Sequence, residues 1–406
     1  MTVAAAAGIE VDDRLARRNV LVLALAQALA GGNTMVIFAT GSITGAMLAP
    51  APSLATLPIT AFVVGLWAGT LPVGYLSRVI GRRAAFQVGT AFGTLTGLVS
   101  TLAVLQSSFA LLLAGSFCGG LYAAAHQAYR FAAADTASPA FQPRAISLVL
   151  AGGLLAAFTG PQLAIHTKDF WPPYLFLATY LGQAALAVLA GLVLAFLRIP
   201  RPRAAAGLAD RTRPLSEIMR QPRFIVAVAC GVVSYSAMNF VMTASPLAMV
   251  GCGHSITDAT LGQQWHVIAM YGPSFFTGSL IARFGTERLI GAGLVLFGAS
   301  ASVAMSGTSV AHFWIALILL GLAWNFGFVG ATAMVTECHR PSERSRVQSF
   351  NDFLIFGAMM LGSFGSGQIL ATAGWTAVNQ VVVPAAAAAA ALLGWLMLRS
   401  RKALRE

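Results

Sequence analysis

The chain has 406 residues, of which 57% are hydrophobic and only 9% are charged, and its mean hydropathy is +0.77. Soluble globular domains carry about 25% charged residues, so this composition excludes a water-soluble domain and indicates an integral membrane protein. A net charge of +12 would suit nucleic-acid binding, but the arginines are scattered through short loops without adjacent aromatic stacking platforms, which argues against that function.

Apolar runs of roughly 20 residues, the length of helix that crosses about 30 Å of hydrocarbon, recur along almost the whole chain. The alternating pattern of a membrane β-barrel is absent, so each run is predicted to be an α-helix, which satisfies its own backbone hydrogen bonds in lipid. In chain order the twelve predicted helices cover residues 20–46, 54–76, 84–105, 109–132, 145–166, 174–197, 224–248, 258–282, 288–306, 311–335, 347–370 and 376–398.

One long stretch is too polar to insert, the Arg- and Pro-rich residues 198–223, and it divides the helices into six plus six. Of the 25 lysines and arginines, only Lys168 falls on the far side of this topology. By the positive-inside rule both termini and the linker are predicted to be cytoplasmic. The Ala-rich, Arg-over-Lys composition is typical of a high-GC bacterium, so the predicted location is its cytoplasmic (inner) membrane. The predicted domains are a cytoplasmic N-terminus (1–19), a first half (20–197), a basic linker (198–223), a second half (224–398) and a cytoplasmic tail (399–406).

The two halves echo each other. The pattern Asp135-x-x-x-Pro139 with Arg144-x-x-Ser147 returns as Glu337-x-x-x-Pro341 with Arg346-x-x-Ser349, and residues 74–83 share glycines and a leucine with residues 278–287. Such repeats in membranes usually form transporters with the binding site between them. The predicted fold class is therefore an all-α integral membrane protein with twelve transmembrane helices in two pseudo-symmetric six-helix halves.

With these features the chain resembles the major facilitator superfamily. The family's loop signature after the second helix, Gly-x-Leu-small-Asp-Arg-x-Gly-Arg-Lys/Arg, is matched by Gly74, Leu76, Ser77, Gly81, Arg82 and Arg83, and a weaker second copy is matched by Gly278, Leu280, Arg283 and Gly285. The resemblance spans all twelve helices and implies a secondary active transporter that works by alternating access.

The signature departs from the family where an acidic residue is expected, because Arg78 stands there and Ala282 stands in the second copy. The resemblance implies that the family's carboxylate engages the cytoplasmic N-terminus of the eleventh helix when the cytoplasmic side is closed. Asp352 in the predicted helix 347–370 offers the opposite charge, so Arg78 is predicted either to pair with Asp352 or to bind lipid phosphate. Arg82 and Arg83 are predicted to bridge to Asp135, and Glu337 to Arg288 or Arg344; such pairs would bias a conformational equilibrium.

Polar residues inside spans are costly in hydrocarbon and tend to face a cavity. Residues Tyr122, His126, Tyr129 and Arg130 share one helix face, and the second half carries Trp324, Asn325 and Phe328 at the same place. In the resembled family helices 1, 4, 7 and 10 line the central cavity, which adds Gln27, Asn33, Thr34, Tyr235, Asn239 and Thr243 as candidates. The alternative is that these residues only pack between helices and that Arg130 only reaches to the interface.

No nucleotide-binding or hydrolase motif is present, so no enzyme activity, cofactor or metal site is predicted. An aromatic and amide-lined cavity with a basic end suits a planar, polar or anionic small solute, whereas the lack of a mid-membrane carboxylate disfavours lipophilic cations. His126 is the candidate for proton coupling. Gly160 and Pro161 partly match the family's antiporter signature and favour export slightly. The alternatives are an importer of a vitamin-like or nutrient solute and a transport-inactive sensor or assembly partner. The chain is predicted to function as a monomer.

Overall fold

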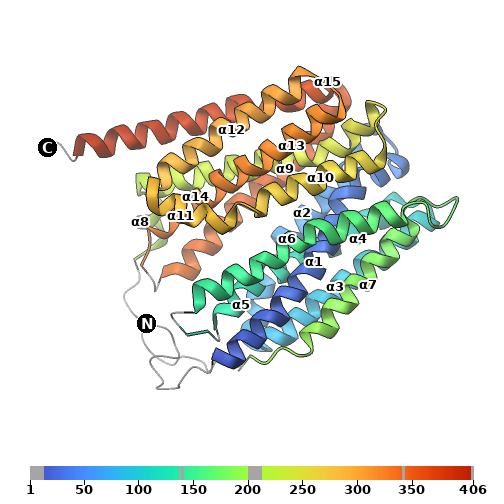
Figure 1. The fold of residues 1–406 in the computed structure, drawn as a ribbon, viewed down its shortest axis with the longest axis horizontal. Helices are drawn as coiled ribbons and strands as arrows, with labels where there is room; N and C mark the ends of the chain where they lie inside the picture. The colour runs from blue at the N-terminus through green and yellow to red at the C-terminus, as the bar shows by residue number, and fades with distance from the viewer. Residues whose placement is uncertain (1–12, 136, 139–140, 200–212, 341–342, 404–406) are drawn as a thin grey trace. The chain divides into compact units, whose positions relative to one another are not determined.

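The computed structural model describes residues 13–135, 137–138, 141–199, 213–340 and 343–403 (Figure 1). The predicted N-terminal segment before residue 13, most of the basic linker (200–212) and the last three residues lie outside the described residues. Every regular element in the described ranges is helical. The chain divides into two compact units, one of residues 1–44 and 61–205 and one of residues 45–60 and 206–406.

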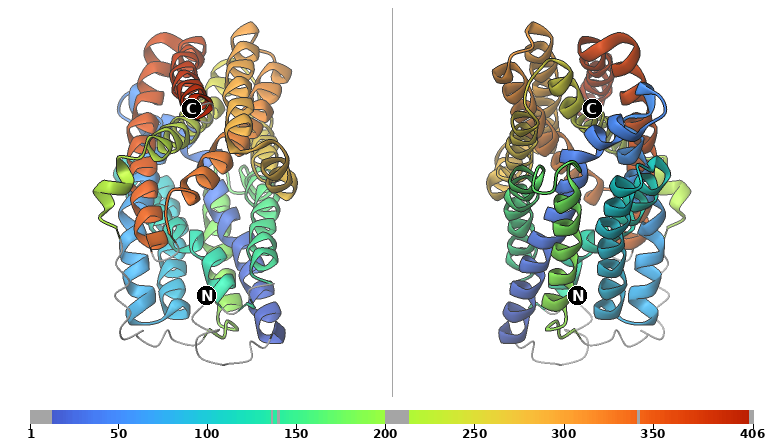
Figure 2. Two further views of the ribbon diagram at one scale, coloured as in Figure 1. Left: turned by 90° about the vertical axis from the view of Figure 1, so that its left-hand side faces the viewer. Right: turned by 90° about the vertical axis from the view of Figure 1, so that its right-hand side faces the viewer.

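The first unit contains the amino-terminal helices, which run alongside one another as long rods (Figure 1, Figure 2). They are α1 (Asp13–Leu48, whose last turn belongs to the second unit), α2 (Leu57–Val79, whose first turn does), α3 (Arg82–Leu105), α4 (Phe109–Gln127), α5 (Tyr129–Asp135), α6 (Gln142–Thr167) and α7 (Leu177–Leu194).

The second unit begins with the short helix η2 (Pro52–Leu54) and continues after the linker. Its helices are α8 (Leu215–Met219), α9 (Pro222–Gly251), α10 (Ile256–Tyr271), α11 (Ser274–Phe284), α12 (Thr286–Ser306), α13 (Val310–Trp324), the π-helix η3 (Asn325–Val329), α14 (Gly330–Thr336) and α15 (Arg344–Ala403). Residues 45–60, which the sequence placed in the first half, belong to this unit because Thr60 and Ser53 bond to Ser363 and Gln368 of α15.

The helices account for the twelve predicted spans. Within the described ranges, ten helices are long and apolar enough to cross a membrane. Within α15 the backbone at Gly374 (φ 77°, ψ −175°) is not helical, so this element is two successive rods. The pair α10 and α11 flanks the sequence Gly272-Pro273 and supplies one more span that neither helix provides alone. The predicted fold class, an all-α multi-span membrane protein, is confirmed.

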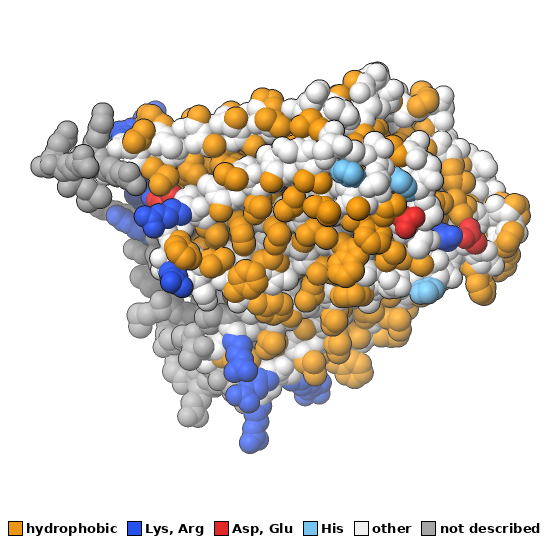
Figure 3. Space-filling model, turned by 45° about the horizontal axis from the view of Figure 1, so that its top comes forward, with side chains coloured by type: hydrophobic (Ala, Val, Ile, Leu, Met, Phe, Trp, Pro, Cys, Tyr) orange, Lys and Arg blue, Asp and Glu red, His pale blue; other side chains and the backbone are white. Residues whose placement is uncertain are grey.

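Local sequence explains where several of these helices begin. Ser108, Ser255 and Ser309 stand before α4, α10 and α13, and each side-chain oxygen accepts a backbone N–H from the first turn. Such caps satisfy amide groups that the helix itself leaves unbonded. The helices then present apolar side chains outward, for example Leu71 at 66% and Val295 at 73% exposure. Figure 3 shows hydrophobic side chains over long stretches of the helix surface, as expected for a surface in lipid.

Inside the first unit, polar side chains tie helices together where lipid offers no partner. Asn33 of α1 donates to the backbone of Gln183 in α7 (2.8 Å), and the Gln183 amide donates back to the Asn33 backbone (2.9 Å). Asn19 exchanges two similar bonds with Arg198 beyond α7. All four bonds join residues far apart in sequence, so they fix α1 against α7.

Candidate functional site

The loop signature has the same backbone in both units. Gly81 (φ 88°, ψ 156°) precedes α3, and Gly285 (φ 85°, ψ 160°) precedes α12. A residue with a Cβ is strongly disfavoured in this region, so glycine is required at both places. The repeat seen in the sequence is therefore also a structural repeat. By contrast, an added Cβ at Gly74 or Gly278 would meet nothing within 4 Å.

In the first unit the signature arginine forms the predicted ion pair. The guanidinium of Arg82 contacts the carboxylate of Asp135 at the end of α5. Arg83, the other predicted partner, is exposed. The pair links the start of α3 to the end of α5 within one unit.

In the second unit the basic partner comes from another helix, α9. Glu287 occupies the signature position that Arg83 holds in the first unit, and Glu337 stands in place of Asp135. Arg223 from the first turn of α9 bonds to both carboxylates, to Glu287 at 2.6 Å and to Glu337 at 2.9 Å through its Nε. A guanidinium carries five N–H donors in a rigid fork and can serve two carboxylates at once.

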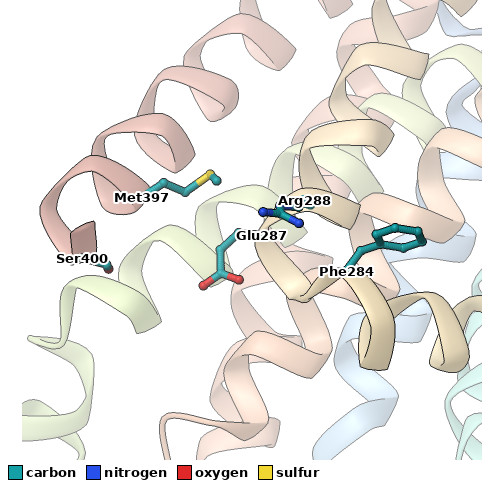
Figure 4. A pocket seen from close by; sticks show the side chains of 5 residues that line it. All are labelled: Phe284, Glu287, Arg288, Met397 and Ser400. Carbon is teal, nitrogen blue, oxygen red and sulfur yellow. The ribbon is translucent and has the colours of Figure 1, made fainter. Parts of the chain in front are cut away.

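Among the described side chains Glu337 pairs with Arg223, whereas Arg288, one of its two predicted partners, forms no ion pair with it. The side chain of Arg344, the other expected partner, lies outside the described residues. Arg288 instead lines a concave surface of about 350 Å³ with Phe284, Glu287, Met397 and Ser400. Figure 4 shows Met397 and Ser400 on the last turns of α15, across this hollow from Glu287 and Arg288 at the start of α12.

The remaining signature residues lie at helix ends. Arg78 is exposed in the last turn of α2, and Arg283 is exposed beside the Phe284 ring, 5.2 Å from its centroid. Asp352 is half-buried and accepts a bond from the Asn351 amide (3.2 Å). Arg78 and Asp352 belong to different units, so their pairing stays a prediction.

Two of the candidates on α1 contact the candidate histidine of α4. His126 of α4 is buried, with Nε2 3.2 Å from the Thr34 hydroxyl and Nδ1 3.4 Å from the Gln27 amide nitrogen, both on α1. With the amide nitrogen donating to Nδ1, the proton of a neutral imidazole sits on Nε2 and is donated to Thr34. The contacts therefore suit the neutral ring.

The rings of Tyr122 and Tyr129 meet the His126 ring at centroid distances of 5.9 Å and 6.3 Å and also pack between helices. Tyr122 lies fully buried against α3, where an added Cβ at Gly93 would be 2.3 Å from its ring. Tyr129 packs edge-on against Phe86, with centroids 4.7 Å apart. Arg130 is half-buried, 4.8 Å from the Phe131 ring centroid. Asn33, as described above, bonds to α7 and α3 and does not reach His126.

In the second unit the predicted aromatic residues form a cluster. Trp324 and Phe328 are stacked, with centroids 5.1 Å apart and planes 20° apart. Tyr235 of α9 lies edge-on to both rings, at 5.5 Å and 4.9 Å. Two residues that sequence reasoning missed complete it: Tyr271 contacts Trp324 and Phe356 contacts Tyr235. Tyr271 directly precedes the helix-breaking Gly-Pro pair, a signal that could have found it, whereas Phe356 lies in an ordinary apolar run.

Asn325 has a structural task. Its side chain is fully buried, donating to the Met270 carbonyl (2.7 Å) and the Ser274 hydroxyl (2.8 Å) and accepting from Thr277 (2.6 Å). Pro273 breaks the hydrogen-bond ladder between α10 and α11, and Asn325 supplies partners across that break. Asn239 and Thr243 on α9 are also buried, and the Asn239 amide nitrogen and the Thr243 hydroxyl have no hydrogen-bond partner among the described residues.

The interruptions of the fourth helix correspond between the units. In the register that aligns Asp135 with Glu337, Tyr122 and His126 stand where Trp324 and Phe328 stand. The short helices α5 and α14, of 7 residues each, then occupy equivalent places. In the first unit the helix breaks at Ala128, whereas in the second it passes through the π turn η3. In each unit, therefore, the helix that carries the aromatic candidates departs from regular α-helical geometry.

Several known proteins are similar to this chain in sequence or in fold. A curated riboflavin transporter, RfnT of Brucella anthropi, is 48% identical over 92% of this chain and 94% of its own length. Two uncharacterized MFS-type transporters of Bacillus subtilis, YddS and YdeG, are 26% and 28% identical over 91% and 92% of the chain. A crystal structure of a mutant of the nucleoside transporter NupG superposes with a TM-score of 0.67 over 93% of this chain and 99% of that one, at 12% identity.

The family-level match covers nearly all of the chain. The Major Facilitator Superfamily model matches residues 20–274 and 265–406. These ranges include both copies of the loop signature, with their matching glycine conformations, and both ion-pair clusters. The protein is thus a multi-pass membrane transporter, and the chain belongs to the Major Facilitator Superfamily.

Proposed function

We propose that this protein transports riboflavin across the bacterial inner membrane by alternating access. The observation that carries the proposal is 48% identity to a riboflavin transporter over more than nine-tenths of both chains. The aromatic cluster of the second unit supports it, because flat aromatic side chains suit a flat fused-ring solute. Riboflavin also fits the planar, polar solute class expected from the sequence.

The test is riboflavin flux in a bacterial strain that can neither make riboflavin nor take it up. Cells expressing the chain are expected to show saturable flux of labelled riboflavin, either into the cells or out of preloaded cells, in competition with unlabelled riboflavin and not with uridine. Uridine is the matched competitor because the structural neighbour is a nucleoside transporter. Membrane-inserted protein without any saturable riboflavin flux refutes the proposal, and binding without flux would identify a sensor.

Membrane vesicles prepared from these cells determine the direction of transport. The Gly160-Pro161 pair of α6 favours export, whereas a vitamin-like solute suits an importer. Inverted and right-side-out vesicles, each loaded with or without riboflavin, distinguish export from import. Net flux against the riboflavin gradient in only one of the two orientations assigns the direction.

We further propose that flux is coupled to protons through His126. Protonation of His126 would place a donor on Nδ1 against the Gln27 amide nitrogen, so the amide must turn to offer its oxygen. This rearrangement connects the charge on α4 to the position of α1. The variant His126→Gln keeps a polar side chain but cannot titrate. It is expected to exchange riboflavin at equal pH yet to lose acceleration by an imposed pH gradient; wild-type acceleration in this variant excludes the role.

A further inference from the structure

The aromatic cluster of the second unit has an ordered ring geometry. The stacked rings of Trp324 and Phe328 present parallel planes, and Tyr235 closes one side edge-on at interplanar angles of 83° and 87°. Tyr235, Tyr271 and Phe328 each retain exposed surface. The cluster draws on α9, α10, α13 with η3, and α15, all within one unit.

The two parallel rings lie at the π turn. The π-helical residues Asn325–Val329 follow Trp324 and include Phe328, so the angle between the two side chains differs from that of an ordinary helix turn. At the equivalent positions of the first unit, without a π turn, Tyr122 and His126 meet edge-on at 80°. π turns occur frequently at functional sites. Close packing against α12 holds the turn in place, because an added Cβ at Gly293 would lie 2.5 Å from the Gly327 nitrogen.

Two buried N–H groups beside these rings have no acceptor. Trp324 is only 5% exposed and its indole nitrogen has no hydrogen-bond partner among the described residues. Two other tryptophans of this unit are satisfied, since Trp314 donates to the Asp258 carbonyl (3.0 Å) and Trp375 to the Ala304 carbonyl (3.1 Å). Buried tryptophan N–H groups usually find a partner, and leaving one unpaired is unfavourable. The amide of Asn239, one turn along α9 from Tyr235, lacks an acceptor in the same way.

We propose that the cluster of Tyr235, Tyr271, Trp324, Phe328 and Phe356 binds the isoalloxazine ring by stacking, with the indole N–H of Trp324 and the Asn239 amide donating to acceptors on the ring. The inference rests on the proposed transport of riboflavin. A flavin ring offers what these groups lack: a flat fused system for the aromatic faces and carbonyl oxygens and ring nitrogens as acceptors along its edge. Recognition is therefore of the ring and not of the ribityl chain.

The test measures binding to the detergent-solubilised full chain by the quenching of flavin fluorescence, which stacking on aromatic side chains produces. Riboflavin is compared with lumiflavin, which has the ring but no ribityl chain, and with ribitol as competitor. Both flavins are expected to bind and to be quenched, and ribitol is expected not to displace them. Riboflavin binding without lumiflavin binding would overturn the inference. So would a result in which the lipophilic cation tetraphenylphosphonium displaces riboflavin but lumiflavin does not.

Variants separate the two contributions. Trp324→Phe keeps a ring and removes the N–H, so the Kd for both flavins is expected to rise about three- to tenfold with quenching retained. Phe328→Leu removes the stacked partner and is expected to weaken binding about tenfold and reduce the quenching. The matched control is Trp314→Phe, which removes an indole N–H that is already satisfied; its Kd should equal that of wild type.

The outcomes distinguish this inference from the proposed function. Wild-type protein that neither binds nor transports riboflavin defeats both. Wild-type protein that transports riboflavin while Trp324→Phe, Asn239→Ala and Phe328→Leu all bind with unchanged Kd defeats only the site. Should Trp324→Phe fail to fold, as judged by its elution on size exclusion, Asn239→Ala decides, because it removes the second donor without touching the aromatic rings.

Discussion

Gly81 and Gly285 show how a single residue type can be dictated by backbone geometry. Both have φ near +85° and extended ψ, a region that costs a residue with a side chain on the order of 1–3 kcal/mol. Gly81→Ala and Gly285→Ala are each expected to lower the unfolding temperature of the solubilised protein, whereas Gly74→Ala, at a helical position with free space, is not. Equal unfolding temperatures for all three variants would contradict this account.

At the same scale, neighbouring residues can have different tasks. Asn33 and Thr34 were predicted together as cavity residues, yet Thr34 contacts His126 while Asn33 bonds to α7. Successive side chains on a helix point about 100° apart, so adjacency in sequence does not place them on one face. Hydropathy shows only that both residues are polar. Which of them faces His126 depends on the rotation of α1 about its own axis.

At the scale of elements, the end of the linker is clamped to the turn before α15. Glu343 is 2% exposed and accepts bonds from the Arg213 side chain (2.8 and 3.0 Å), the Arg213 backbone and the Arg340 backbone. Arg213 also reaches the Cys338 carbonyl. These bonds, chiefly those from Arg213, hold the pKa of Glu343 well below its usual range. Sequence reasoning missed this pair because its members are 130 residues apart and neither lies in a motif.

The clamp predicts a pH dependence. A carboxyl whose pKa is lowered on folding stabilises the fold above its unfolded pKa, near 4.5, and loses that contribution as the pH falls toward the lower folded value. Glu343→Gln is therefore expected to lower the unfolding temperature at pH 7 and to narrow the gap to wild type as the pH falls below 4.5. Arg213→Gln should produce the same change, and the double variant should lose little more than either alone. Fully additive losses would mean that the two side chains act independently.

For the whole molecule, the distribution of basic residues predicts the orientation in the membrane. With Lys168 the only exception among the 25, both termini are expected on the cytoplasmic side. Reporter fusions test this: a fluorescent protein attached after residue 406 should fluoresce, and alkaline phosphatase attached there should be inactive, while phosphatase inserted after Lys168 should be active. Phosphatase activity at the C-terminus would reverse the topology.

The membrane class, the twelve helices and the duplicated signature could be predicted from the amino-acid sequence. Hydropathy, charge and the need for glycine at a positive φ are properties of single residues and their immediate surroundings. The sequence also marked the aromatic candidates in the fourth helix of each half. Four contacts came from the three-dimensional packing: Arg223 partners Glu337, Asn325 bridges a helix break, Phe356 joins Tyr235, and Trp324 stacks parallel to Phe328. Each of these depends on how helices rotate and pack against segments distant in the chain, and such contacts leave no local pattern in the sequence.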